Sequence, residues 1–126
     1  MFWKLFSERI EEFMQTHSKR GIWMKGDANF FGIESHGVTQ VRGNGILLIT
    51  DIDLVFGMFQ PKRDFLFPLN QIEKIELAES HLNKTVFQPL LKVFFKNEEG
   101  DLDSVAWWVA NPTEWKKILE QCIKNQ

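Results

Sequence analysis

The chain has 126 residues and a formal net charge of −2, and 44% of its residues are hydrophobic. This size suits a single domain, and the apolar content is high enough for an ordinary core, which argues against a disordered chain. A slightly acidic chain lacks the basic field of a nucleic-acid binder and the charge needed for strong electrostatic docking on an anionic membrane.

The sequence shows neither a membrane span nor an export signal. It contains no run of about eighteen apolar residues, and its apolar start meets Ser7, Glu8 and Arg9 too soon to form the core of a signal peptide. The single cysteine, Cys122, excludes an internal disulfide and fits a reducing compartment. We therefore expect a soluble, cytoplasmic protein of one domain, residues 1–126.

Residues 1–20 are predicted to contain an amphipathic helix, because Phe6, Ile10 and Phe13 fall on one helical face. One interpretation is an interfacial membrane helix anchored by the Phe2–Trp3 pair. Membrane-surface helices favour Lys and Arg on the polar face, whereas this face carries glutamates. The pattern therefore favours a helix packed on its own domain or on a partner subunit.

Residues 21–110 are predicted to be rich in strands. A short extended piece at residues 22–25 precedes a first strand at residues 28–34. The central feature is a hairpin over residues 43–59 that turns at Asp51–Asp53. Both of its strands are apolar at consecutive positions, so both faces of the hairpin should be covered. The N-terminal helix is the nearest apolar surface that could cover the outer face.

Two more strands are predicted at residues 65–69 and 72–77, the first being ended or placed at a sheet edge by Pro68. Residues 78–89 lack periodicity and are predicted as a loop. A second hairpin pairs residues 90–96 with residues 102–109. In it Phe94 and Trp108 point away from the core-facing residues, which again indicates a second covered or adhesive surface.

Residues 111–124 are predicted to form the closing helix. Asn111 suits the capping position and Pro112 the first turn. An apolar stripe follows at helical spacing, formed by Trp115, Ile118, Leu119 and Cys122. This stripe can cover the open end of a sheet.

Several pieces resemble the GRAM and bacterial PH-like families of the pleckstrin-homology superfold. They are residues 45–50, Leu54 with Phe56, residues 67–69 with Ile72, and Trp115 in the closing helix. The resemblance covers roughly residues 28–124. It implies a mainly β (α+β) fold, a partly open barrel of about seven antiparallel strands capped by a C-terminal helix. The N-terminal helix is an addition to that pattern.

Members of such families bind phosphoinositides, bind proteins or act as scaffolds, and the fold does not choose among these roles. Lipid-binding members concentrate Lys and Arg between their first two strands, where this chain has Glu34, Ser35 and His36. We therefore expect a non-enzymatic module that binds a protein partner or a second copy of itself. The candidate interaction face comprises Phe6, Ile10, Phe13, Phe94 and Trp108.

Two alternatives stay open. Weak membrane association or headgroup binding would use Arg42, Lys62 and Arg63. A small-ligand carrier or enzyme would need a deep pocket with convergent polar groups, which the sequence does not indicate.

No motif in the sequence indicates a catalytic or metal centre, so we expect no enzyme activity and no cofactor. The glycines at 43 and 45 precede a strand, whereas a phosphate loop leads into a helix. The acidic residues at 51–53 and 97–103 suit turns better than metal sites. Three histidines lack metal-ligand spacing, Ser35 next to His36 is not a nucleophile and its base, and Cys122 lies on the buried stripe.

Overall fold

The computed structural model describes residues 6–126, apart from the side chains of residues 86 and 87. Within this range the chain forms seven strands and two α-helices, so the predicted mainly β architecture is confirmed. The strands are β1 (Met24–Ile33), β2 (Gly43–Ile49), β3 (Asp53–Met58), β4 (Arg63–Pro68), β5 (Ile72–His81), β6 (Lys84–Lys96) and β7 (Leu102–Val109). The helices are α2 (Ser7–His17) and α3 (Pro112–Lys124), with short 3₁₀ turns η1 (Ser18–Arg20), η2 (Glu34–His36) and η3 (Leu69–Gln71).

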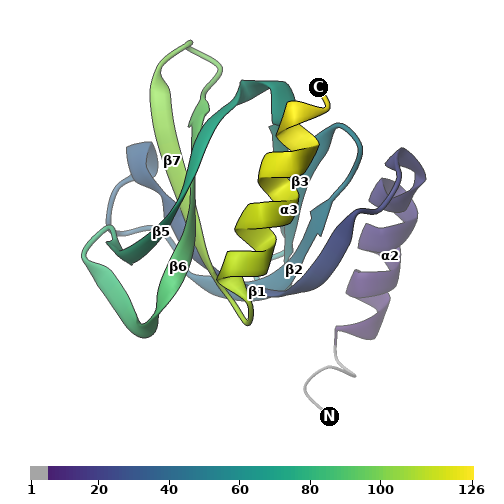
Figure 1. Cartoon of the computed structure of the whole chain (residues 1–126). Coiled ribbons are helices and arrows are strands. Elements are labelled where there is room, and N and C mark those ends of the chain that lie inside the picture. Colours follow the sequence, from purple (N-terminus) through teal and green to yellow (C-terminus); the bar gives the residue numbers. More distant parts are fainter. Residues whose placement is uncertain (1–5) are drawn as a thin grey trace.

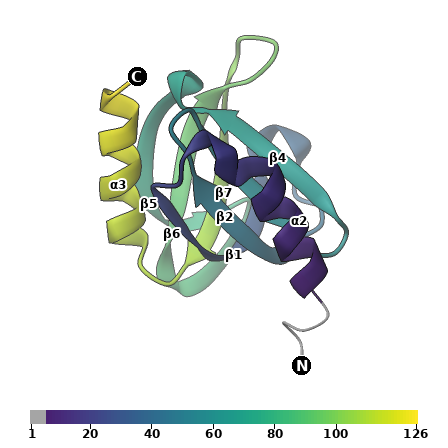
Figure 2. The same cartoon turned by 90° about the vertical axis from the view of Figure 1, so that its right-hand side faces the viewer.

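The strands form one antiparallel sheet in the order β4-β3-β2-β1-β7-β6-β5, so β4 and β5 are its edges. Figure 1 shows the sheet curled into a partly open barrel with α3 lying across the opening. Figure 2 shows α2 on a different side, against the outer surface of the β2–β4 region. Pro68 lies in edge strand β4, as predicted, where a missing N–H is tolerated.

Aromatic side chains fill the centre of the barrel. Phe30 of β1, Phe56 of β3 and Trp107 of β7 are at most 1% exposed. The ring centroids of Phe30 and Phe56 are 5.5 Å apart, and those of Phe56 and Trp107 are 6.0 Å apart. Phe65 and Phe67 of β4 lie against this group, 4.6 Å from Phe30 and 5.7 Å from Trp107. Stacked and edge-on pairs of this kind stabilise the fold beyond the area they bury.

The closing helix packs as the sequence predicted. Pro112 occupies its first turn, and Trp115, Leu119 and Cys122 are buried against the barrel. Asn111 stands at the capping position, but its side chain makes no capping hydrogen bond; its carbonyl accepts the N–H of Trp115 instead. The stripe of apolar residues therefore holds α3 in place more than the cap does.

Two boundary predictions are wrong. Residues 24–33 form one continuous strand where the sequence suggested two pieces, because pairing with both β2 and β7 overrides the break expected at Gly26. Residues 78–89 are not a loop, since β5 runs on to His81 and β6 begins at Lys84. The connecting turn uses Leu82 and Asn83 with φ of 52° and 62°. Turns with positive φ at both central positions normally carry Asn or Gly, so Leu82 gave no signal in the sequence for this hairpin turn.

Candidate functional site

α2 covers the outer face of the central hairpin. Phe13 is 1% exposed, and it packs in a cluster with Ile46, Leu48 and Val55. A Cβ atom on Gly57 of β3 would overlap the Phe13 ring, so this glycine lets the helix approach the strand closely. The hairpin is therefore covered on both faces, as the sequence predicted.

Three of the five candidate interaction residues are consequently occupied within the chain. Phe13 is buried, Ile10 packs beside it, and the Phe6 ring stacks on Phe59 with centroids 4.7 Å apart. They hold α2 on its own barrel and do not face outward. Phe2 and Trp3, the anchors of the alternative membrane helix, lie outside the described residues.

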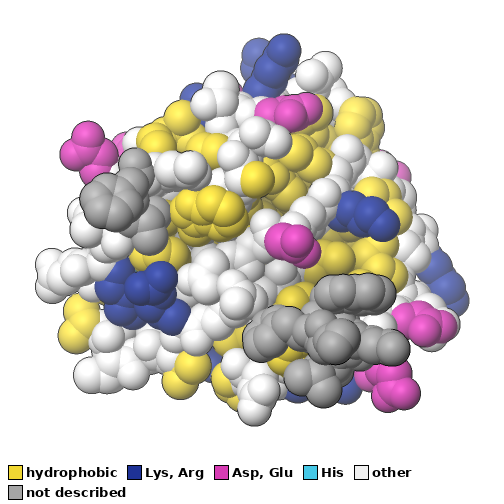
Figure 3. Space-filling model, turned by 90° about the horizontal axis from the view of Figure 1, so that it is seen from below, with side chains coloured by type: hydrophobic (Ala, Val, Ile, Leu, Met, Phe, Trp, Pro, Cys, Tyr) yellow, Lys and Arg dark blue, Asp and Glu magenta, His cyan; other side chains and the backbone are white. Residues whose placement is uncertain are grey.

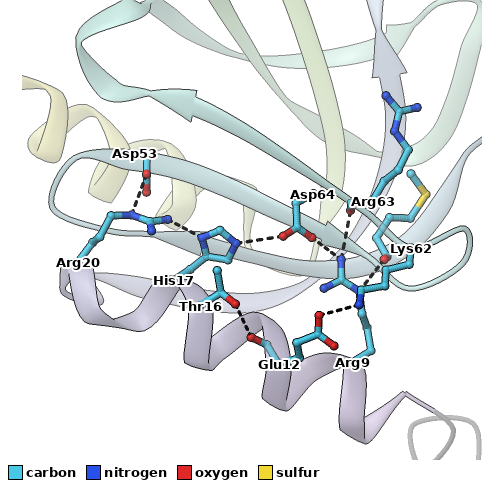
Figure 4. A network of polar contacts seen from close by, with 10 residues as sticks. Arg9, Glu12, Thr16, His17, Arg20, Asp53, Lys62, Arg63 and Asp64 are labelled. Carbon is cyan, nitrogen blue, oxygen red and sulfur yellow. Dashed lines mark hydrogen bonds and ion pairs between the residues drawn. The ribbon is translucent and has the colours of Figure 1, made fainter.

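Polar contacts fix the same helix to the sheet at both of its ends (Figure 4). Arg9 forms an ion pair with Asp64 of β4, and its Nε donates to the carbonyl of Met58 over 3.1 Å. At the other end Arg20 Nε lies 2.9 Å from Asp53 Oδ2. Because these contacts join residues far apart in the sequence, they set the position of α2 along the hairpin.

His17 connects the two ends of this network. Its Nδ1 lies 2.6 Å from Arg20 Nη2 and its Nε2 lies 3.1 Å from Asp64 Oδ2. A guanidinium only donates, so Nδ1 must accept and Nε2–H must donate to the carboxylate. Although burial opposes ionisation of Asp64, hydrogen bonds from Arg9 and His17 hold the pKa of its carboxyl below the usual value.

Arg42, the first candidate headgroup residue, lies in the loop before β2. Its guanidinium is stacked 3.8 Å from the centroid of the Phe31 ring. The next residue, Gly43, lies close to the carbonyl of Gln60 in the β3–β4 turn. Arg42 therefore lies at the same end of the sheet as Lys62 in the β3–β4 turn and Arg63 at the start of β4.

Lys62 and Arg63 are also engaged within the chain. Lys62 Nζ lies 2.6 Å from Glu12 Oε1 of α2, and both side chains are more than half exposed. The Arg63 guanidinium lies 4.5 Å from the centroid of the Phe65 ring. An incoming anionic headgroup would have to compete with Glu12 for Lys62.

The outer face of β1, β6 and β7 carries a second apolar cluster. Phe31, Leu90 and Ala106 are buried in it, and half-buried Trp108 packs against them. Within the described residues, no residue of α2 or α3 belongs to this cluster. Phe94 lies further along β6, also half-buried, with Lys74 Nζ and Lys92 Nζ at 4.6 and 5.1 Å from its ring centroid.

Figure 3 shows the face of the molecule that points downward in Figure 1. Hydrophobic side chains gather in several areas of this face, with charged side chains between and around them. A surface of this kind differs from the scattered single apolar residues found on most proteins. It is a candidate docking surface for another macromolecule.

A separate cleft of about 1080 Å³ lies between edge strand β4 and the end of β6 with the β6–β7 turn. Apolar side chains of β1, β4 and β6 line it, among them Ile33, Phe67 and Phe95. Its rim includes the β6–β7 turn with Glu98, Glu99 and Asp101. No group of three or more His, Cys, Asp or Glu side chains within the described part of the chain is placed to hold a metal ion.

Two polar residues that line this cleft, Ser35 and Asp103, are hydrogen-bonded to each other. Asp103 is 4% exposed and accepts hydrogen bonds from the N–H and hydroxyl of Ser35, at 3.0 and 2.5 Å, and from the N–H of Ser104. Burial opposes ionisation of Asp103, but these hydrogen bonds hold its pKa below the usual value. The Ser35 hydroxyl is bonded to Asp103 and His36 is exposed, an arrangement in keeping with the structural role that the sequence suggested for this neighbouring pair.

Cys122 is 2% exposed and packs in the core, as its place on the helical stripe predicted. Burial raises the pKa of its thiol, with a smaller contribution from the negative charge of Asp51. A neutral thiol is a poor nucleophile, so Cys122 serves packing.

Sequence reasoning missed the cleft altogether. Its apolar lining comes from three strands that are distant in the sequence. The acidic β6–β7 turn was visible as a polar stretch, but its position opposite β4 depends on how the sheet curls.

No protein-family model and no curated protein matches this sequence. Solved structures match its fold at low identity. The C-terminal domain of an unknown protein from Leishmania infantum has a TM-score of 0.60 and 14% identity, covering 94% of this chain and 98% of that one. The DH/PH fragment of PDZRHOGEF, in complex with human RhoA, has a TM-score of 0.60 and 13% identity over 91% of this chain.

The N-terminally truncated linker-DH/PH domains of p115-RhoGEF are a further match, with a TM-score of 0.57 and 14% identity over 93% of this chain. This chain spans about a third of the two RhoGEF chains, 32% and 33% of their lengths. At these identities the likeness shows the fold alone. The protein has the PH-like fold that the sequence resemblance implied, whereas the GRAM family within it stays a prediction. Within the described residues no helix is long and apolar enough to cross a membrane.

Proposed function

We propose that this chain is a non-enzymatic PH-like binding module whose partner is a protein, and that it docks through the outer apolar face around Trp108 and Phe94. Within the superfold, the GRAM and bacterial PH-like families are its proposed relatives. The observation that carries the proposal is the half-buried Trp108, which packs against the buried cluster on the outer face of β1, β6 and β7. The equivalent face over β2 and β3 is covered by α2.

Physical chemistry supports a protein partner at this face. Tryptophan and other large aromatic residues supply much of the binding energy at protein interfaces, especially when a polar rim surrounds them. Lys74 and Lys92 flank Phe94 and provide such a rim. Neighbouring folds are found with protein partners, since the PDZRHOGEF fragment is seen with RhoA, and a binding role is consistent with that class of domain.

The test uses Trp108→Glu and Phe94→Glu, each of which places a charge on the proposed interface. We expect the unmodified chain to self-associate, measured by light scattering after size exclusion, or to retain protein partners in affinity capture from its own cells. Whichever association is seen, both variants should lose it. Leu102→Glu is the matched control, because Leu102 is 64% exposed and not part of the cluster. Association that survives both variants would contradict the proposal.

A second candidate function is weak binding of an anionic lipid headgroup by Arg42, Lys62 and Arg63. The observation in its favour is that Arg42 and the β3–β4 turn meet at one end of the sheet. Co-sedimentation with vesicles containing anionic lipid, compared with neutral vesicles at low salt, tests it. The triple variant R42Q/K62Q/R63Q should lose binding, and no binding by the unmodified chain would eliminate this candidate.

A further inference from the structure

The cleft at the barrel opening combines three features that suit an extended cationic peptide. The first is its shape and floor. Residues of β4 and β6 line it together although these strands are far apart in the sheet order, so the cleft occupies the gap where the barrel stays open. Phe67 and Phe95 contribute apolar surface, with ring centroids 4.9 Å apart. This floor can contact the aliphatic stems of long side chains.

The second feature is the free edge of β4. The N–H of Leu69 donates to the carbonyl of Ile52. This pair lies two positions beyond the Leu54–Phe67 pair of β3 and β4, so Leu54 and Phe67 are also a hydrogen-bonded pair, and Val55 and Leu66 are not. Hydrogen-bonded pairs alternate in an antiparallel ladder, so the backbone N–H and C=O of Leu66 point away from β3. Because β4 ends the strand order, these groups face the open gap. They offer pairing positions for an extended segment.

The third feature is the charge of the opposite rim. Among the described residues outside this rim, six acidic side chains lie in ion pairs, as Glu12 does with Lys62 and Glu120 with Lys116. Glu98, Glu99 and Asp101 form no ion pair within residues 6–126. The one lysine in the lining, Lys96, lies 3.9 Å from Glu73. The rim therefore presents uncompensated negative charge across the cleft from the free edge.

The turn that carries these charges is ordered. Asn97 Oδ1 accepts the N–H groups of Glu99 and Asp101 at 3.0 Å each, and Gly100 adopts φ of +81°. The backbone that carries the acidic side chains is therefore fixed before any partner arrives, which lowers the entropy cost of ordering this turn on binding.

We infer that this cleft binds an extended segment of a partner protein that carries Lys or Arg side chains, with its backbone along β4 and its cations at the β6–β7 turn. Charge complementarity decides against an anionic occupant such as a phosphate or lipid headgroup, which the acidic rim repels. This surface is separate from the Trp108 face, so either proposal can fail without the other.

The probe is a display library of random dodecapeptides selected on the intact chain. We expect the selected peptides to be enriched in Lys and Arg, and the triple variant E98Q/E99Q/D101N to bind them about tenfold more weakly by fluorescence anisotropy, since three exposed ion pairs are removed. The matched control E8Q/E11Q/E114Q removes three exposed acidic groups elsewhere and should leave binding unchanged.

A second pair of variants tests the location. Leu66 and Ile22 are both 48% exposed. Leu66→Lys places a positive charge, the same sign as the peptide's, in the lining of the cleft, whereas Ile22 is not a lining residue. We expect the first to weaken peptide binding and the second to leave it unchanged. Peptides without cationic enrichment, equal binding by the two triple variants, or equal effects of the two lysine substitutions would each overturn the inference.

Discussion

Phe13→Ala is the sharpest test of how α2 belongs to the domain. The Phe13 side chain is 1% exposed and lies against Ile46, Leu48 and Val55. Removing a fully buried phenylalanine costs about 3–5 kcal/mol in transfer free energy and cavity formation. The helix has eleven residues, too few to be stable alone in water, so its order depends on this packing. We expect a loss of about 3 kcal/mol in the free energy of unfolding.

Urea denaturation followed by tryptophan fluorescence measures this loss, and amide hydrogen exchange over residues 7–17 shows where it falls. If α2 undocks before the barrel unfolds, exchange in α2 should rise while the barrel strands stay protected. Glu11→Ala, on the exposed side of α2, is the control and should change stability by less than about 0.5 kcal/mol. A loss below about 1 kcal/mol with unchanged protection of α2 would refute the view that Phe13 holds the helix.

Three further predictions concern the polar and buried groups. Asp64→Asn should lower the free energy of unfolding, measured with urea, by about 2 kcal/mol, because it leaves the nearly buried Arg9 side chain without its carboxylate. Glu12→Gln, in the exposed pair with Lys62, should lower it by less than about 0.5 kcal/mol. Equal losses would contradict the view that the Arg9–Asp64 pair stabilises the fold more than the exposed pair. Burial lowers the pKa of His81 from its usual 6.5, so the unfolded chain binds the proton more readily than the folded one. The free energy of unfolding should therefore fall as pH drops below 6.5. This pH-dependent loss should be smaller in His81→Gln, whose amide can still donate to the carbonyl of Gly32. A thiol reagent at pH 8 should modify Cys122 only as fast as the chain opens, and rapid labelling of the folded protein would show that the thiol is accessible.

The position of α2 bears on both proposals. Because Phe6, Ile10 and Phe13 face the chain's own sheet, they leave the Trp108 face and the cleft as the surfaces open to a partner. The two surfaces differ in chemistry, one apolar with lysines at its margin and the other acidic. A partner that used both would need an apolar patch and a separate basic segment.

Local pattern in the sequence determined much of this architecture. Consecutive apolar positions in residues 45–59 predicted a hairpin covered on both faces, and helical spacing from Trp115 to Cys122 predicted the closing helix. These predictions were sound because side-chain periodicity is a property of neighbouring residues, and burial of each apolar face is then required by the hydrophobic effect.

The candidate sites were decided by the tertiary structure. Trp108 and Phe94 were found from alternation along their strands, but the cleft joins Ile33, Phe67 and Phe95, which meet only because the sheet curls. The contact of Arg9 with Asp64 likewise spans 55 positions. Such meetings depend on strand register and on the twist that brings the two sheet edges together, and no short stretch of sequence specifies either of these.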